Sequence, residues 1–422
     1  MKKILAIVLV VLLIISLSGC WDYEEYENLT QVYGMGIDYN VDMHEITVIL
    51  EHVDSQKGGS SGGASSSGQS KGMSPKGVVH FATGTTIMEA LEKIQQGIEK
   101  KLFYGYLSVL IIGEDAGKYI TKDIFELVYR TPLIRTTADV IIAKGRAKDV
   151  LSKFDPDTSV ATSQNISKMI KNFKNTGSAY PVTIMDFIDM MTVGGDEPVA
   201  PIISVIDLSK KKDEQNTNTD EEGVGMDHIM PLEQKEGHFY INNMAVFKGG
   251  NLLGELNEKE SKGLVWVSNK NEISYVNISS DESNSSIKTM SFRIISSKSS
   301  IKPIIGNGSL TYNISVKVEA ELRKYLSDGG STDITPDIII KMEEKLSDNI
   351  KSNIRAVLSK AQKEYKSDIF GFGNILYKES PKIWHEEYEN TWSEVFPQVP
   401  VNVYIKAKVI NTGTNINKFD VR

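Results

Sequence analysis

One cysteine occurs in the 422 residues, so no disulfide within the chain can hold its fold together. The fold must therefore rest on buried apolar side chains. The composition suits this, because 40% of the residues are hydrophobic and 24% are charged, as in ordinary globular domains. A chain of about 400 residues exceeds what one hydrophobic core organises, so we expect two or three domains.

The single cysteine, Cys20, stands at the end of a segment with the three parts of a secretory signal. Two lysines form its positive start, residues 4–17 form an apolar run of 14 residues, and Ser18-Gly19 place small side chains before the cysteine. A membrane-spanning helix needs about 20 apolar residues, so this run is short for a permanent span. Leu-Ser-Gly-Cys fits the bacterial lipoprotein signal, in which diacylglycerol alkylates the thiol before cleavage. We therefore predict a signal peptide at 1–19 and lipidation of Cys20.

Two other interpretations of this segment stay open. In the first, the chain is an ordinary secreted protein with a chance cysteine at position 20. In the second, an uncleaved N-terminal helix anchors the protein in the membrane. No second apolar run in the sequence approaches the length of a membrane span.

The charge balance is acidic. The formal charge is −8, and it becomes −10 when residues 1–19 are removed with their two lysines. Binding to nucleic acid or to anionic lipid headgroups needs a basic surface. We therefore expect no nucleic-acid partner, and contact with the lipid bilayer through a diacylglyceryl group on Cys20.

Composition divides the mature chain into two parts. Residues 20–206 alternate strand and helix patterns, as in 32–38, 45–53 and 106–112 for strands, and we expect an N-terminal α/β domain. Within it, the run 54–77 is dominated by Gly and Ser and predicts a flexible loop. Residues 207–237 are polar and aperiodic, which indicates a linker or exposed loop.

The remaining residues, 238–422, predict a C-terminal α+β region, as one domain or as two divided near 285–300. Segments at 290–296, 298–305 and 310–322 alternate like antiparallel strands, and 399–409 reads as a last strand. Thr335 and Pro336 begin an apolar stripe that predicts a helix of about 30 residues packed across a sheet. The fold class we expect is multidomain α+β, with mixed sheets, packed helices and this long helix against an antiparallel sheet.

No catalytic, cofactor-binding or metal-binding residue can be assigned from the sequence. The six histidines form no paired zinc motif, and Gly34-Met35-Gly36 lacks the third glycine of a dinucleotide loop. The cluster of Trp384, acidic residues and Trp392 is typical of a helix packed by tryptophan. We therefore expect a protein that is not an enzyme.

Several motifs together resemble one family, the Ger(x)C lipoproteins, which are the C subunits of spore germinant receptors. The motifs cover nearly all of the mature chain. The segments at 54–77 and 207–237 depart in length from the family pattern, at places where loops are expected. They are Gly19-Cys20-Trp21-Asp22, the segment 32–38, the strand at 107–113, the pair 245–248 and 253–256, Asp368-Ile369-Phe370-Gly371-Phe372-Gly373, and 392–397.

The resemblance implies a lipid-anchored, non-catalytic subunit on the outer face of the spore inner membrane. It also implies two membrane-embedded receptor subunits as partners, and mixed α/β domains without an enzymatic site. Apart from the lipidated Cys20, it transfers no ligand residue. The alternative function is a solute-binding lipoprotein of a transporter, although the order of elements does not show the two similar lobes usual in that class.

Overall fold

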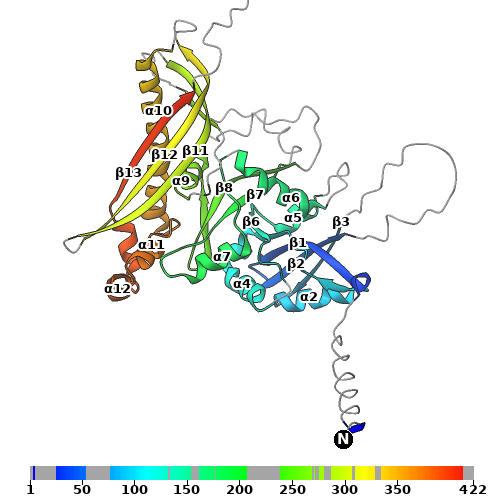
Figure 1. Ribbon diagram of the computed structural model, residues 1–422. Helices are drawn as coiled ribbons and strands as arrows, with labels where there is room; N and C mark the ends of the chain where they lie inside the picture. The colour runs from blue at the N-terminus through cyan, green and yellow to red at the C-terminus, as the bar shows by residue number, and fades with distance from the viewer. Residues whose placement is uncertain are drawn as a thin grey trace, which may run out of the picture.

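The structure is a computed structural model, and it describes residues 3–4, 25–53, 77–131, 134–153, 161–175, 177–206, 238–268, 270, 275–279, 287–306, 309–327 and 334–411. Within them the chain forms two sheets with helices packed on both (Figure 1). Cys20, the linker at 207–237 and most of the Gly/Ser run lie outside the described residues. Gly77, which the sequence placed at the end of that run, is the first residue of a strand.

The first sheet has nine strands in the order β3-β2-β1-β5-β6-β7-β8-β9, with β4 paired to β1. The pairs among β1, β5, β6 and β7 are parallel, and so is the short pair of β4 with β1. The remaining pairs, β1 with β2, β2 with β3, β7 with β8 and β8 with β9, are antiparallel. The strands are β1 (Leu29–Asn40), β2 (Glu45–Val53), β3 (Gly77–Gly84), β4 (Lys101–Phe103), β5 (Val109–Gly113), β6 (Asp139–Ala143), β7 (Val199–Ile206), β8 (His238–Lys248) and β9 (Asn251–Leu256).

The central strands β5 and β6 are buried along their whole length. Their sequences, Val-Leu-Ile-Ile-Gly and Asp-Val-Ile-Ile-Ala, lack the alternation of a strand with one wet face. That pattern is typical of parallel strands covered by helices on both faces. In Figure 1, α5 and α6 lie above this part of the sheet, and α2 and α4 lie below it.

The elements that accompany the first sheet are short. They are η1 (Tyr26–Asn28), α2 (Ile87–Gln96), α3 (Glu114–Tyr119), α4 (Thr121–Arg130), α5 (Ala147–Leu151), α6 (Thr162–Lys171), η2 (Asn172–Asn175) and α7 (Ile184–Thr192). Two of them begin at threonine caps, since Thr86 accepts the Glu89 amide and Thr183 accepts the Asp186 amide. Such caps satisfy backbone N–H groups that have no partner within the helix.

Two glycines in β1 let helices approach the sheet closely. A Cβ on Gly34 would meet Ser163 of α6, and one on Gly36 would crowd Leu151 and Ala147 of α5. The Gly-Met-Gly segment is therefore strand, and its glycines serve helix packing, which agrees with its rejection as a dinucleotide loop.

The first sheet continues beyond the predicted linker. Strand β8 pairs with β7 from Val199↔Val246 to Ile206↔His238, and β9 extends the sheet further. Residues 238–256 thus complete the sheet of the N-terminal part, although the sequence groups them with the C-terminal region. The division of the chain into domains stays a prediction.

The second sheet has the order β10-β11-β12-β13. Its strands are β10 (Tyr275–Ser279), β11 (Ile287–Gly306), β12 (Ser309–Ser327) and β13 (Val401–Asn411). The two segments predicted at 290–296 and 298–305 are one strand, β11, with a register shift between Ile294 and Ser296. Strands β11 and β12 are antiparallel as predicted, and β10, which the sequence did not predict, pairs antiparallel with β11. Strand β13 runs parallel to β12, because the chain returns to the start of β12 after the helices.

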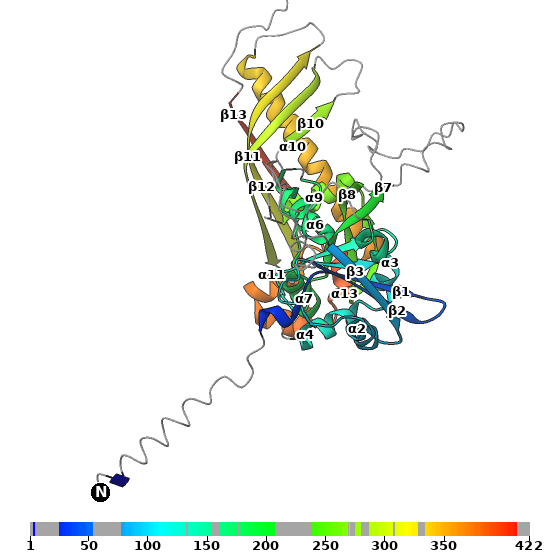
Figure 2. The same cartoon turned by 90° about the vertical axis from the view of Figure 1, so that its right-hand side faces the viewer.

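The long C-terminal helix is confirmed. Helix α10 (Pro336–Ser359) has 24 residues, and the six-residue π-helical segment η4 (Lys360–Tyr365) continues it. Its buried stripe includes Met342, Leu346 and Ile350, as the apolar spacing predicted. Figure 2 shows α10 lying along the second sheet, and the predicted mixed α+β class is confirmed.

Helix α9 (Glu258–Val267) packs between α10 and the first sheet, where Asn257 and Glu260 form its capping box. Short helices follow α10 and lead to β13. They are α11 (Phe372–Glu379), α12 (Pro381–Ile383), the π-helical η5 (Trp384–Tyr388), α13 (Trp392–Val395) and η6 (Phe396–Gln398).

The contact between α9 and α10 gives a testable prediction. An alanine side chain at Gly263 would collide with the Asn353 carbonyl oxygen on α10. Replacing glycine by alanine inside a helix normally stabilises it by about 1 kcal/mol, but overpacking here should cost about 1–3 kcal/mol. We expect Gly263→Ala to lower the free energy of unfolding in urea.

The matched control is Gly117→Ala in α3. There the added Cβ would meet only the Leu252 side chain, at 3.3 Å from Cδ2, besides a more distant contact with Ile112. A Gly263→Ala variant as stable as this control would contradict the close packing.

Candidate functional site at the junction of the two sheets

The segment 367–374, which follows the long helix, joins the two halves of the molecule. Its centre is Asp368, which is only 3% exposed. The carboxylate accepts three hydrogen bonds, from the Phe372 amide at 3.1 Å, the Gly373 amide at 2.9 Å and the Trp392 indole N–H at 2.9 Å. Two of these donors are backbone groups at the start of α11, so the acid both caps that helix and holds Trp392 against it.

The same segment is bonded to the first sheet. The Ser367 hydroxyl donates to the Phe247 carbonyl of β8 at 2.6 Å. The Glu197 amide, just before β7, donates to the Asp368 carbonyl at 3.0 Å. The backbone N–H of Asn374 donates to the Gly195 carbonyl at 3.1 Å. These bonds connect 367–374 to β8 and to the segment that enters β7.

Aromatic side chains connect this segment to the second sheet. Tyr312 of β12 stacks on Phe372 with ring centroids 4.4 Å apart, and its hydroxyl donates to the Phe372 carbonyl at 2.7 Å. Trp392 packs edge-on against both Tyr312 and Trp384. The tryptophans are buried, as predicted for a helix packed by tryptophan, while the nearby Glu386 is exposed.

A second carboxylate, Asp196, lies beside Gly371, where the backbone has a φ of +66°. A side chain at Gly371 would crowd the carboxylate, so glycine suits both the left-handed backbone and the close approach. Burial raises the pKa of Asp196 to about 6, against smaller opposing effects that include the Asn374 side chain. Burial likewise raises the pKa of Asp368 to about 7, although three donors face that carboxylate.

A cavity of about 550 Å³, the junction pocket, opens beside these groups. It receives side chains from α7, from α9 and the residues after it, from β11 and from 369–378. Its polar lining includes Asp186, Asp189, Asp196, Lys270, Asn374 and Lys378. Pockets that lie between structural units and contain convergent polar groups with shifted pKa values are preferred places for ligands.

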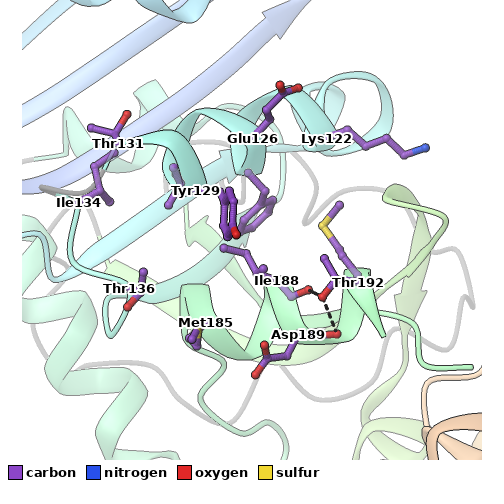
Figure 3. A pocket seen from close by; sticks show the side chains of 13 residues that line it. Lys122, Glu126, Tyr129, Thr131, Ile134, Thr136, Met185, Ile188, Asp189 and Thr192 are labelled. Atoms are coloured by element: carbon purple, nitrogen blue, oxygen red, sulfur yellow. Dashed lines mark hydrogen bonds between the residues drawn. The ribbon is translucent and has the colours of Figure 1, made fainter. Parts of the chain in front are cut away.

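A second concavity, the helical groove, lies between α4 and α7 and has a volume of about 630 Å³ (Figure 3). Tyr129 and Ile188 point toward each other across it, and Met185 and Ile134 line its sides. Tyr129 is 79% exposed and Met185 is 52% exposed. In both Figures 1 and 2, α4 lies at the same end of the molecule as the dark-blue start of the body. The groove thus presents apolar side chains at that end.

The predicted site residue, Cys20, lies outside the described residues. Within the described part, no group of three or more His, Cys, Asp or Glu side chains could hold a metal ion, and no helix is long and apolar enough to cross a membrane.

The sequence analysis did not identify two buried acids that accept hydrogen bonds from the starts of helices. Asp38 accepts the Ala147 and Lys148 amides at the start of α5, and Glu51 accepts the Thr162 and Ser163 amides at the start of α6. An acid inside or at the end of an apolar strand is the signal that could have indicated them.

The two junction carboxylates should respond differently to the same substitution. Asp368→Asn replaces one acceptor oxygen by an N–H group facing a donor, so below about pH 4 we expect a loss of about 1–3 kcal/mol in the free energy of unfolding. Burial also raises the pKa of Asp368 to about 7, and the variant has no carboxyl group to ionise, so this loss should shrink as the pH rises from about 4 to about 7. Asp196 has a folded pKa of about 6 against 3.8 ordinarily, so the folded state keeps a proton that the unfolded state releases. Its ionisation therefore lowers stability as the pH rises from about 4 to about 6.

The Asp196→Asn variant has no carboxyl group at this position, so it avoids the loss of stability that ionisation of Asp196 causes. Relative to the unsubstituted protein, it should gain stability across that pH window and hold the gain above it. Urea unfolding from below pH 4 to above pH 7 measures both variants. A loss below pH 4 that is equal in the two variants would contradict the assignment of a structural acceptor at 368 and an under-compensated charge at 196.

Family models match both parts of the chain. The model described as "Spore germination protein N-terminal domain" matches residues 22–205, and the model described as "Spore germination B3/ GerAC like, C-terminal" matches residues 242–413. The unmatched residues between the two models overlap the predicted linker.

Curated relatives match the chain over almost its whole length. Spore germination protein KC of Bacillus subtilis is 25% identical, over 99% of this chain and 97% of the relative. Spore germination protein B3 of the same organism is 23% identical, over 95% of this chain and 96% of the relative.

The fold is similar to that in the crystal structure of the GerBC protein. The match has a TM-score of 0.50 and 17% sequence identity, and it covers 90% of this chain and 97% of that chain. Both parts of the chain, and the fold that joins them, thus have counterparts in one group of proteins. The chain belongs to the Ger(x)C family of spore germination proteins.

Proposed function

We propose that this protein is a lipid-anchored, non-catalytic subunit of a spore nutrient germinant receptor. It acts on the outer face of the spore inner membrane, by assembly with membrane-embedded subunits that together trigger germination. The observation that carries the proposal is the match of both family models and of full-length relatives named as spore germination proteins.

The anchor in this proposal is a diacylglyceryl group on Cys20. Cys20 precedes Glu25, the first residue of the described body, by five positions. Five residues span at most about 17 Å, since an extended chain covers 3.3–3.6 Å per residue. The bilayer surface is then close to the end of the body that contains η1. Two acyl chains on one residue hold a protein stably, whereas a single chain does so only marginally.

The helical groove supports the assembly part of the proposal. It lies at the end of the body that the tether holds near the membrane, and its exposed Tyr129 and Met185 surround an apolar concavity. Aromatic residues and methionine are enriched in the cores of protein interfaces. We therefore assign the groove to contact with an extracytoplasmic segment of a membrane-embedded receptor subunit.

The anchor is tested by Cys20→Ala. We expect loss of radiolabelled palmitate incorporation and loss of pelleting with spore membranes, because the thiol that forms the thioether is gone. Ser18→Ala is the matched control, since it keeps a small residue before the cysteine and should retain the label. Label and pelleting that persist in Cys20→Ala would contradict lipidation at this residue.

The groove is tested by Tyr129→Glu combined with Met185→Glu. Both side chains are exposed, so the variant should keep its thermal unfolding temperature and its membrane pelleting. We expect it to lose co-purification with the membrane-embedded subunits and to impair germination, because two charges would be buried unpaired at the interface. Tyr404→Glu, at a residue of β13 that is 56% exposed, is the control. Normal co-purification of the groove variant would exclude this surface.

A further inference from the structure

The helical groove lies between two helices that pack side by side. Phe125 of α4 stacks on Phe187 of α7 with ring centroids 4.3 Å apart, and Phe125 also lines the groove, so the pair forms part of its floor. Tyr129 on α4 and Met185 on α7 are exposed above that floor. Helix α4 has 10 residues and α7 has 9, so each is roughly 15 Å long. The groove thus has the length of about three turns of a further helix.

The polar groups of the lining already have partners. The Thr131 hydroxyl donates to a backbone carbonyl of α4 at 2.8 Å, and the Thr192 hydroxyl donates to a backbone carbonyl of α7 at 2.9 Å. Glu126 pairs with Arg130 at 2.9 Å. The backbone groups within the two helices are bonded along each helix. An occupant therefore meets few free hydrogen-bond donors or acceptors in the groove.

Such a lining selects among polypeptide conformations. An extended segment would bring backbone N–H and C=O groups into an apolar groove that offers them few partners, and burying such groups unpaired costs free energy. A segment without regular structure would meet the same cost. An α-helix bonds its own backbone groups, so its apolar side chains alone enter the groove. The lining therefore favours a helical occupant.

The width of the apolar surface favours a helix over a lipid acyl chain, although neither brings unpaired polar groups. Tyr129 is 79% exposed and Met185 is 52% exposed, and the two belong to different helices (Figure 3). A single hydrocarbon chain on the floor would leave the outer parts of both side chains in water. A helix is about 10–12 Å across with its side chains, so it contacts both at once.

The two edges of the groove carry opposite charges. Lys122 on α4 and Asp189 on α7 line it, and neither forms an ion pair with a residue that the structure describes. In Figure 3 both lie at the edges of the groove, whereas Tyr129 and Ile188 lie nearer its centre. An apolar centre with a charged rim is typical of a protein interface. A basic residue on the α7 side of a bound helix would complement Asp189.

We propose that the segment of the receptor subunit that binds the helical groove is an amphipathic α-helix of about three turns. Its apolar side chains recur at positions i, i+3, i+4 and i+7 and pack against Tyr129, Met185 and Ile188. A basic residue beside this stripe faces Asp189. The inference rests on the proposed function for the identity of the partner, and it adds the conformation and side-chain pattern of the bound segment.

Photocrosslinking of the full chain in spore membranes tests the proposal. The photoreactive residue p-benzoylphenylalanine replaces Tyr129 in one variant and Met185 in another. In the control variant it replaces Tyr404 on the exposed side of β13. Mass spectrometry identifies the partner residues that each probe labels. We expect both groove probes to label one segment of a receptor subunit, at residues three, four or seven apart, and the control to label none of them.

Proline in the labelled segment separates a helix from the other conformations. Proline replaces a residue in the middle of that segment, on the side away from the labelled residues, and alanine at the same position is the matched control. Because proline interrupts a helix and alanine favours one, proline should reduce co-purification about tenfold or more, and alanine should leave it unchanged.

The charge at the edge of the groove is tested in the same assay. Asp189→Lys should reduce co-purification about two- to fivefold at low salt and less at high salt, because it reverses the charge that faces the basic residue. Asp348→Lys, on the exposed side of α10, is the control and should have no effect. Equal co-purification of the two variants would overturn the assignment of a basic residue beside Asp189.

The helical conformation is overturned if the labelled residues alternate at a spacing of two, as in a strand, or if proline and alanine act alike. In either case the groove still binds a receptor subunit. Labelling of lipid alone, or of no receptor subunit, overturns the inference together with the assignment of the groove. Co-purification of the unsubstituted protein with the membrane-embedded subunits then shows whether the proposed receptor assembly itself holds.

Discussion

The fold depends on the three hydrogen bonds that converge on the buried carboxylate of Asp368. An acid without partners could not remain at this depth, because removal of a charge from water costs several kcal/mol. The Phe372 and Gly373 amides and the Trp392 indole offset part of that cost, and they connect the start of α11 and the tryptophan cluster to the acid. The backbone carbonyl of the same residue accepts the Glu197 amide. One residue thus fixes α11, the tryptophan cluster and the entry to β7 together.

Close backbone contacts are the second constraint. Gly195 and Gly373 lie against each other and against Trp384, Gly263 lies against the carbonyl of Asn353, and Gly254 leaves room for the Tyr365 hydroxyl. That hydroxyl donates to the Glu255 carbonyl, which links the end of the long helix to β9. Of these glycines, Gly254 and Gly373 lie in the motifs that resemble the family, at positions where no turn is needed. The motif at 368–373 lies at the junction between the sheets, and the proposed receptor role would use this junction as its rigid centre.

Prediction from the sequence succeeded where a local pattern decides the structure. The stripe after Thr335 gave the long helix and its buried side, and the uninterrupted apolar run at 109–112 gave a central strand. It failed where pairing partners lie far apart in sequence. The serines at 296–300 look like a break between strands, yet β12 pairs with β11 through them. The parallel direction of β13 and the placement of β8 in the first sheet follow from pairings between distant residues, such as Glu321 with Asn411 and Val199 with Val246, that no local pattern encodes.

The sequence by itself determined the mixed α+β class, the long helix, the family and the single candidate for lipidation, because each rests on residues close together in the chain or on ordered motifs. Only the tertiary structure decided that Asp368, Asp196, Asn374 and Lys270 share one junction, and that Tyr129 faces Ile188 across a groove. The physical reason is that burial, pKa and hydrogen-bond satisfaction depend on which distant segments surround a side chain. The raised pKa of Asp196 and the three hydrogen bonds to Asp368 arise only where the two halves of the molecule meet.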